Sequence, residues 1–563
     1  DVAVAVSCAV LLSLVVSVLV IPSFAAQVLG PVSADKQQDG PSPLATRIGA
    51  FAGWATASLG RAGALVGGVV VTMVALTWLL LPAMEYLPTG NRNLLFGVLV
   101  PPPGTSVDEL VDVGQGFQNQ LQPYTELAET EADRDGVPAI RRSFFVARTG
   151  QVFMGASSRD PSRIGDLVAH YRRQQGTVPG MFGVASQASL FGRGLASNRA
   201  VDVELGGSDL GQLVGAGAQL MPALAAALPG AQIRPIPGLD LGAPEVRVFP
   251  RREDAARLGL SGADIGALVD VVVDGRIIGE LGRGGRPNLN VVLRARDGGV
   301  ATPADLRAAP VATPSGPTTP MQSVAEVSET LGPTTIQRIE RKRAITLQVS
   351  PPDDIALEEA MRRIREEVLP AQSLPADLRI TLAGTADDLE LAQDRFSEVL
   401  LLAVIISFLL MAALFEDFLA PLVILFTVPM AAAGGLAGLR LVDAVLGPQP
   451  LDMMTAVGFV LLIGVVVNNA ILVVDGALAR LRSGEELEAA VRSAVERRVR
   501  PIFMSALTSL AGLLPLVLFP GSGSELYRGV GAVVLGGLTL ATALTLVVIP
   551  AAFTLVWRLA RRA

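Results

Sequence analysis

Seven long apolar segments constrain the fold of this chain more than any other feature. Each holds about 16 to 29 residues with almost no charge in its central part, which is enough, or nearly so, for a helix to cross about 30 Å of hydrocarbon. A soluble protein would have to bury all seven, although only 17% of its residues are charged. We therefore expect a multi-pass α-helical membrane protein with about seven spans, at residues 2–20, 62–81, 399–414, 419–439, 453–474, 502–519 and 529–557.

The residue composition argues against several kinds of chemistry. Because Cys8 is the only cysteine and His170 the only histidine, the chain can form neither an internal disulfide nor a Cys/His metal site. The sequence lacks a phosphate-binding GxxxxGK[ST] loop, which argues against ATP as the energy source. The net charge of −7 gives no support to a nucleic-acid partner. We accordingly expect no enzyme activity, no cofactor and no metal site.

The arginines predict how the spans are oriented. Residues 480–501 contain six arginines and residues 558–563 three more, and Lys and Arg beside spans stay on the cytoplasmic side. Counting spans by parity from these two places puts residues 84–395 on the periplasmic side and the C-terminus in the cytoplasm. The same count puts the N-terminus outside, although no charged segment precedes the first span. We interpret this as missing upstream sequence.

Residues 84–395 alternate strand and helix patterns, with Pro/Gly turns between them. One helix start, Ser106 with Glu109, has the spacing of a capping box, and it is followed by alternating strands at 143–147 and 151–155. A second round of such elements is interrupted by an insert that holds a Gly-rich hairpin. This order predicts two split βαβ units of the ferredoxin-like kind. The second unit comprises strands at 200–205, 232–235, 344–349 and 378–383 and helices at 210–228 and 356–368.

These patterns divide the chain into seven regions. A weakly amphipathic segment, 44–59, predicts a helix on the cytoplasmic surface, although a plain linker explains it almost as well. We expect a transmembrane helix at 1–21, a linker and surface helix at 22–61, a transmembrane helix at 62–83, a βαβ subdomain at 84–195, a second at 196–243 with 336–395, the insert at 244–335, and five transmembrane helices at 396–563.

The last 170 or so residues carry a specific resemblance. In order and spacing they resemble the final five spans of resistance-nodulation-division permeases, and the closest subgroup is the hydrophobe/amphiphile efflux type (AcrB-like). The resemblance extends over essentially the whole chain. It is carried by FEDFLAPLVILFTVPMAAAGG, GFVLLIGVVVNNAILVVD, RVRPIFMSALTSLAGLLPL and GVGAVVLGGLTLATALTLVVIPAAFTLVW.

This resemblance implies the C-terminal half of such a pump, beginning at its sixth span. The two βαβ units then correspond to periplasmic porter subdomains and the insert to a docking subdomain. The resemblance also implies a homotrimer in the bilayer of the bacterial inner membrane, joined by a periplasmic adaptor and an outer-membrane channel. The implied activity is secondary, proton-driven export of hydrophobic or amphiphilic small molecules.

Polar residues inside the predicted spans are candidates for proton coupling. Two adjacent asparagines lie well inside one span, and hydroxyl residues share a face of the next at i, i+3 and i+4 spacing. Asp and Glu are absent from the middle of every span, so the resemblance places the essential acid pair upstream. The relay candidates are Asn468, Asn469, Arg498, Ser505 and Thr508.

The resemblance gives three of these residues specific counterparts. Asn468 takes the place of a lysine that pairs with the acids in many such pumps, Ser505 that of a relay threonine, and Arg498 that of a relay arginine. Structural explanations compete with these roles. Asparagines can simply join helices, Ser and Thr commonly bond their own preceding turn, and an arginine at a span end can be a positive-inside anchor.

A cleft for amphiphiles needs adaptable apolar side chains. The candidates lie in the strands and loops of the first βαβ unit, although strand alternation makes most of them equally suited to an ordinary core. The methionines of the outer region are scattered in sequence, which argues against a methionine chain for copper or silver and so against heavy-metal efflux, although folding could still gather them. The cleft candidates are Phe144, Phe145, Phe153, Met154 and Phe182.

Other functions within the same superfamily stay open. A lipid mover, a protein-export component and a non-transporting assembly scaffold share the membrane architecture that the resemblance implies. Export subunits resemble this architecture with smaller outer domains, so the roughly 310 residues between the second and third spans argue against that alternative.

Overall fold

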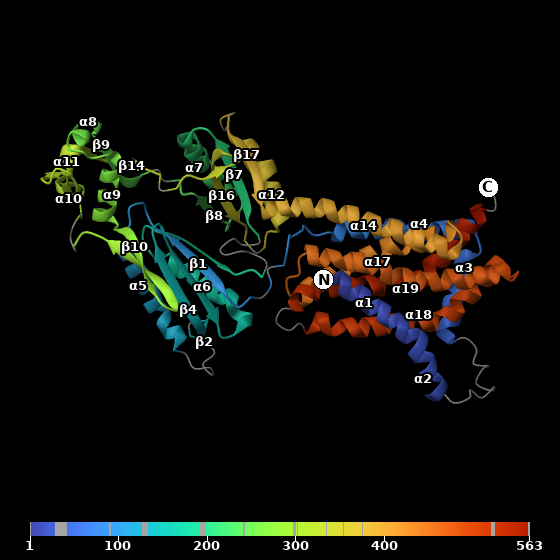
Figure 1. Cartoon of the computed structure of the whole chain (residues 1–563). Helices are drawn as coiled ribbons and strands as arrows, with labels where there is room; N and C mark the ends of the chain where they lie inside the picture. Colours follow the sequence, from blue (N-terminus) through green and yellow to red (C-terminus); the bar gives the residue numbers. More distant parts are fainter. Residues whose placement is uncertain are drawn as a thin grey trace.

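The computed structural model describes residues 2–28 and 42–560, apart from 89, 91, 127–132, 135, 191–198, 240–241, 297–299, 301, 334, 353, 374, 376 and 520–523. It has two parts, a bundle of long helices and an α+β region at one end of that bundle (Figure 1). Helix α14 (Thr385–Phe415) follows directly on a strand of the α+β region and continues into the bundle. The predicted fold class, a multi-pass helical protein with a large α+β region, is confirmed.

The described residues contain eight helices that are long and apolar enough to cross a membrane. One of them, α7 (Leu210–Ala227), packs on a sheet of the α+β region, so seven belong to the bundle. These seven cover the predicted spans. They are the N-terminal helix (α1, Val2–Val15; Val16–Val20; α2, Ile21–Val28), α4 (Leu59–Leu80), α14, α15 with α16 (Leu419–Leu425, Thr427–Leu446), α17 (Met453–Arg482), α18 (Leu487–Leu518) and α19 (Arg528–Ala560).

The first helix extends past its predicted end at residue 21. Val16–Val20 form a π-helical segment, and α2 continues from it to Val28. Pro22 has no N–H to donate and its ring crowds the carbonyl four residues earlier. Because the wider π turn lies directly before the proline, the helix accommodates Pro22 and does not end there.

Of two other spans that contain a proline in their interior, only one is interrupted there. Phe426 separates α15 from α16, three residues before Pro429, as expected where a proline removes a backbone hydrogen bond. Pro550 lies inside α19 without interrupting it. A helix is present where the surface helix was predicted, as α3 (Pro43–Thr56), which Ser42 caps; its location on the cytoplasmic surface stays a prediction.

Glycines allow α16 and α19 to cross closely in the bundle. A Cβ at Gly434 would lie 2.7 Å from the carbonyl oxygen of Gly536, and one at Gly438 would lie 2.5 Å from that of Ala532. Real Cβ atoms do not approach that closely, so α16 and α19 can meet only where both lack side chains. This crossing places α19 beside α17, which carries the two asparagines.

The first sheet has the strand order β4-β5-β1-β6. Helices α5 and α6 cover one of its faces, and the shared core holds Leu95, Leu99, Leu110, Leu167 and Tyr171. The strands are β1 (Leu95–Val100), β4 (Ile140–Arg148), β5 (Gln151–Ser158) and β6 (Phe182–Gln187); the helices are α5 (Val107–Thr125) and α6 (Ile164–Gln175); β2 (Asp133–Arg134) and β3 (Val137–Pro138) pair separately.

The second sheet is assembled from two separate stretches of chain, as the split βαβ pattern predicts. Its order is β15-β16-β7-β17, and β8 also pairs with β16. Helices α7 and α12 pack on one face. The remaining elements are β7 (Val201–Gly207), β8 (Gln232–Ile236), β15 (Arg338–Ile339), β16 (Lys342–Ser350), β17 (Arg379–Gly384), α12 (Leu357–Arg363), which continues as a π-helical segment to Val368, and α13 (Leu369–Ala371).

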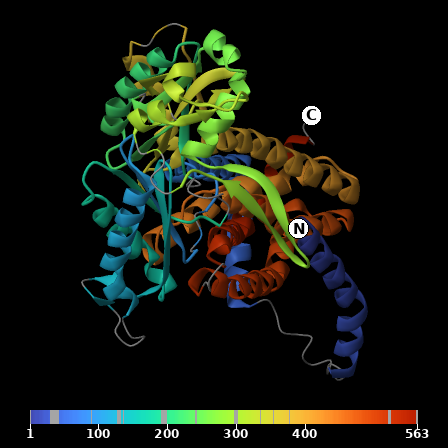
Figure 2. The same cartoon turned by 60° about the vertical axis from the view of Figure 1, so that its left-hand side comes forward.

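The insert between β8 and β15 forms a body of its own, from which a long hairpin projects (Figure 2). Its core gathers Ile265, Leu306, Met321 and Val324. The elements are β9 (Ala243–Pro250) paired with β14 (Ala325–Gly332), α8 (Arg252–Arg257), α9 (Gly262–Val273), the hairpin β10 (Arg276–Arg283) and β11 (Arg286–Leu293), α10 (Pro303–Ala308), β12 (Pro310–Ala312), β13 (Thr318–Pro320) and α11 (Met321–Val324).

Candidate functional site

A polar cavity of about 390 Å³ lies between α17, α18 and α19 in the bundle. Asn468, Asn469 and Ser505 line it, and so does Ser509. Residues four apart lie on one face of a helix, so the spacing of the two serines brings both hydroxyls to the same cavity. The structure thus gathers three of the five predicted relay residues around one space within the membrane bundle.

The two asparagines have different surroundings. Asn469 is buried, and its Nδ2 donates a hydrogen bond to Oγ1 of Thr542 on α19 at 3.1 Å. Asn468 is exposed to the cavity. Asn469 therefore joins two helices, which is the structural role considered above, whereas the amide of Asn468 is available to a group that enters the cavity. Thr542 was missed because it belongs to a distant, otherwise apolar span; the only sequence signal is its spacing of three from Thr539 and Thr545.

The other two relay candidates lie outside this cavity. The hydroxyl of Thr508 donates to the carbonyl oxygen of Met504 at 2.8 Å, within its own helix. Arg498 approaches Asp475 of α17, with 4.0 Å between Nη2 and Oδ2. Asp475 follows Asn468 by seven residues, or about 10 Å along the helix, so this ion pair lies about two turns from the asparagines.

The predicted apolar cleft is divided between two faces of the first sheet. Phe145 and Met154 are opposite each other in the ladder and face the helices: Met154 is 1% exposed, and Phe145 packs on the core beside Gly114. Phe144 and Phe153 point to the other face, with ring centroids 5.8 Å apart. Side chains alternate along a strand, so the five predicted residues cannot line one cleft.

The open face of the first sheet meets the open face of the second. They enclose a cavity of about 20 Å³, roughly the space of one water molecule. From the first sheet the lining residues are apolar or small, and from the second they are polar and include a half-buried arginine. The residues are Val98, Val184 and Ser186 of the first sheet and Gln232, Arg234, Gln348 and Ser350 of the second.

Two carboxylates lie on the open face of the second sheet, on β7. Asp202 accepts a hydrogen bond from Nε2 of Gln348 at 3.2 Å, and Glu204 follows it two residues later on the same face. Burial raises the pKa of Asp202 above its usual value. Burial, followed by the nearby charge of Asp202, raises the pKa of Glu204 as well. Burial disfavours the charged form of both carboxyls, and a cation bound beside them would stabilise that form.

The sequence contains a signal for this carboxylate pair that we had not used. In Val201–Leu205 three buried apolar residues alternate with the two acids. Such alternation puts both acids on the face away from the core. Within the described part of the chain, His, Cys, Asp and Glu do not form a group of three or more that could hold a metal ion.

Among the described residues, a bundle of seven helices long and apolar enough to cross a membrane, with two ferredoxin-like sheets at one end, is the architecture of a multi-pass permease. The family model described as "AcrB/AcrD/AcrF family" matches residues 1–557. The chain therefore belongs to the AcrB/AcrD/AcrF family, which confirms the family resemblance read from the final spans. Membership also makes it a multi-pass inner-membrane protein.

Curated relatives of this chain are named for metal cations. It is 28% identical over 512 residues to the cobalt-zinc-cadmium resistance protein CzcA of Cupriavidus metallidurans, covering 87% of this chain and 47% of the relative. It is 28% identical over 527 residues to the cation efflux system protein CzcA of Alcaligenes sp. strain CT14, again covering 87% and 47%. The chain thus spans about half the length of the curated relatives it matches.

Two solved structures that resemble this chain are also of a heavy metal efflux pump. A heavy metal efflux pump in crystal form II matches with a TM-score of 0.74 and 25% identity over 92% of this chain and 52% of that one. Crystal form I matches with a TM-score of 0.72 and 27% identity over 97% and 54%. These names differ from the amphiphile-efflux subgroup that we predicted, so the comparisons do not support that subgroup.

Proposed function

We propose that this chain is part of a proton-driven efflux permease whose cargo is a divalent heavy-metal cation. The observation that carries the proposal is the pair Asp202 and Glu204 on the open face of the second sheet, where Asp202 accepts a hydrogen bond from Gln348, a residue that lines the small cavity between the two sheets. Carboxylate oxygens bind divalent cations, and a pair supplemented by an amide oxygen or water gives binding weak enough for release. The names of the relatives support the same cargo.

The polar cavity between α17, α18 and α19 is the proposed proton path. Its amide and hydroxyl groups can hydrogen-bond a carboxylate that enters the cavity and exchanges its charge for a proton as access alternates. Asn468, Ser505 and Ser509 face that group, while Asn469 holds α17 against α19. Arg498, paired with Asp475, belongs to the approach at the cytoplasmic end in this proposal. Thr508, whose hydroxyl bonds the carbonyl oxygen of Met504 in its own helix, is assigned no step in the path.

The decisive experiment is transport by the full-length permease in proteoliposomes with an imposed proton gradient. We expect Zn²⁺, Co²⁺ or Cd²⁺ to move with proton counterflow, and ethidium not to move. Export of ethidium without metal movement would overturn the metal proposal and restore the amphiphile prediction. Export of neither would favour a lipid or protein-export component or a scaffold.

Matched variants test the cavity in the same vesicles. Asn468→Ala removes the exposed amide, and we expect proton-coupled export to fall about tenfold or more. Thr539→Val is the control, because the hydroxyl of Thr539 bonds only the carbonyl oxygen of Leu535 one turn away among the hydrogen bonds described. Equal activity of both variants would remove the cavity from the proton path.

The proposed assembly is a homotrimer with a periplasmic adaptor and an outer-membrane channel, with the α+β region periplasmic and the C-terminus cytoplasmic. The exposed apolar hairpin β10–β11 supports a docking role, since a monomer rarely leaves such a surface uncovered. At its base lies a groove of about 560 Å³. Analytical ultracentrifugation of the full-length protein tests this. We expect a trimer for the wild-type protein and smaller species for Ile278→Asp. The exposed large apolar residues of the hairpin are Ile277, Ile278, Leu281, Leu289, Val291, Val292 and Leu293.

A further inference from the structure

A buried ion pair lies where the membrane bundle meets the second sheet. Glu85 and Arg199 are 5% and 8% exposed, and 2.8 Å separates Oε1 of Glu85 from Nη2 of Arg199. The same Oε1 accepts from Nε of Arg199 at 3.1 Å and from the backbone N–H of Leu357, the first residue of α12, at 3.0 Å. Arg199 also donates to the carbonyl oxygen of Ile355 at 2.6 Å. Both members of the pair thus hold the start of α12.

The segment around Glu85 is bonded equally closely to the start of α17. The N–H of Glu85 donates to the carbonyl oxygen of Leu451 at 2.9 Å, and that of Met453 donates to the carbonyl oxygen of Tyr86 at 3.1 Å. Asp452 is completely buried and caps α17 by accepting from the N–H of Thr455 at 2.7 Å. The first turn of α17 is therefore fixed to residues 84–86.

A second connection on the same segment reinforces the first. The N–H of Met84 donates to Oε2 of Glu358 at 2.6 Å, and the N–H of Glu358 donates back to the carbonyl oxygen of Met84 at 3.2 Å. Residues 84–86 thus lie between the first turn of α17 and the first turn of α12. A movement of either helix end must pass through them or break buried hydrogen bonds.

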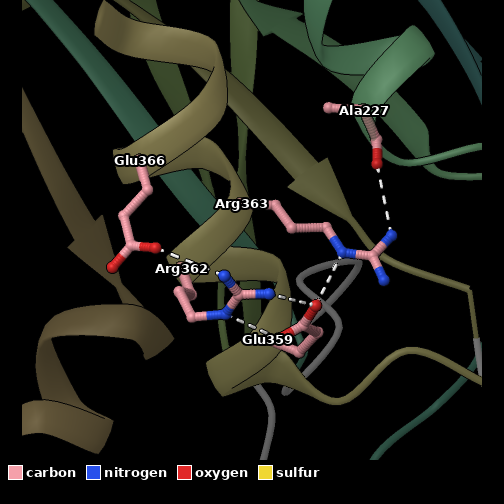
Figure 3. A network of polar contacts seen from close by, with 5 residues as sticks. All are labelled: Ala227, Glu359, Arg362, Arg363 and Glu366. Atoms are coloured by element: carbon pink, nitrogen blue, oxygen red, sulfur yellow. Dashed lines mark hydrogen bonds and ion pairs between the residues drawn. The ribbon is translucent and has the colours of Figure 1, made fainter.

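Of the two helices joined here, α17 carries Asn468 of the proposed proton path, and α12 packs on the sheet that carries the proposed cargo site. Asn468 is 16 residues beyond Asp452 on α17, or about 24 Å along one helix. At the other side, α12 packs on the sheet that presents Asp202 and Glu204. A close network within α12 stiffens it further: Glu359 accepts from Arg362 and Arg363 at 2.8 Å each, and Arg363 reaches the carbonyl oxygen of Ala227 at the end of α7 (Figure 3).

We propose that Glu85 and Arg199 are positioning residues that couple the proton path to the cargo site. They transmit a displacement of α17 to α12 and so to the second sheet, and this inference rests on the proposed function. An exposed ion pair could not do this, because solvent would screen it and its side chains would rearrange. A buried pair resists separation, because losing one partner leaves an uncompensated charge in the protein interior.

The test measures Zn²⁺ export and proton counterflow together, with the full-length permease in proteoliposomes. Glu85→Gln keeps the shape of the side chain and removes its charge; we expect the number of Zn²⁺ ions exported per proton to fall about fivefold or more, while protons still cross. Arg199→Lys keeps the charge but loses the two-nitrogen contact with Oε1, and we expect a smaller fall in the same ratio. If Glu85→Gln does not fold, Arg199→Lys tests the same ion pair.

Glu366→Gln is the matched control. Glu366 lies just beyond α12 in the same continuous helix and is paired with Arg362 at 3.2 Å, but the pair is exposed and internal to that helix (Figure 3). We expect the ratio of Zn²⁺ to protons to stay at the wild-type value. An unchanged ratio in Glu85→Gln and Arg199→Lys, or an equal fall of both fluxes, would overturn the coupling role. Wild-type vesicles that move neither ion would instead refute the proposed function.

Discussion

The first and second sheets have a similar arrangement of strands and helices, but the faces they turn away from their helices differ in chemistry. The open face of the first sheet carries a row of aromatic rings, with Phe96 and Phe144 each within 6 Å of Phe153 between ring centroids. The open face of the second carries Asp202 and Glu204. The side chains that face the helices form the core and stabilise both units. The alternate side chains point away from the core, so they can differ between the two sheets and set what each face can bind.

If the acidic face binds the cargo, removing its charge should have the largest effect. In Asp202→Asn with Glu204→Gln, amides replace both carboxylates, and we expect Zn²⁺ export by the full-length permease to fall about 100-fold, equivalent to about 2.7 kcal/mol. Metal resistance of an efflux-deficient host and flux into proteoliposomes both measure this.

The aromatic face supplies the control for that experiment. Phe144→Ser with Phe153→Ser makes the first sheet's face polar without touching a carboxylate, so Zn²⁺ export should change less than about twofold. A larger loss from the aromatic variant than from the acidic one would reverse our assignment of the two faces.

The two faces of the first sheet should also differ in what they contribute to stability. Phe145 packs between the strand and α5, so we expect Phe145→Ala to destabilise the protein by about 2 kcal/mol through the cavity it leaves. Thermal unfolding in detergent, followed by tryptophan fluorescence or calorimetry, measures this loss.

The pH dependence separates the acidic face from the aromatic one. Burial raises the pKa of Asp202 and Glu204 in the folded protein, so both carboxyls bind a proton more tightly in the folded than in the unfolded state. Their contribution to the free energy of unfolding is therefore fully present below their unfolded pKa. That stability is lost as pH rises through the folded pKa. Asp202→Asn should therefore be more stable than wild type at neutral pH, with a gap that closes on acidification. Metal-free thermal unfolding across pH checks the sign; a gap that widens in acid would contradict it.

The smallest effect is expected at Phe144. Its side chain is 42% exposed, so Phe144→Ala removes little buried surface and should cost less than about 1 kcal/mol. The same unfolding assay compares it directly with Phe145→Ala. A cost as large as that of Phe145→Ala would mean that the open face is covered in the native protein.

Much of the fold could be predicted because membrane spans and strands leave periodic or continuous apolar patterns. The seven spans, a helix at 44–59 and the divided second sheet were all predicted. The end of the first helix was wrong because a π-helical segment before Pro22 is a local adjustment that hydropathy does not register.

The candidate sites were harder to predict from the sequence than the fold. Ser505 and Ser509 could be paired by helical spacing, but Thr542 meets Asn469 only through a crossing of α17 and α19, 73 residues apart in sequence. The aromatic candidates were grouped by position in the chain, and the strand alternation that separates Phe144 from Phe145 placed them on opposite faces. Asp202 and Glu204 carried an alternation signal that went unused.

By itself the sequence determined the membrane spans, the ferredoxin-like units and the family, because each depends on local patterns of apolar residues and on motif order. Only the tertiary structure decided which polar groups meet: the asparagines and serines around one cavity, the open faces of the two sheets, and the joint at Glu85 and Arg199, 114 residues apart. A buried polar group needs a partner wherever the fold can supply one, and no local pattern specifies a partner so distant in the chain.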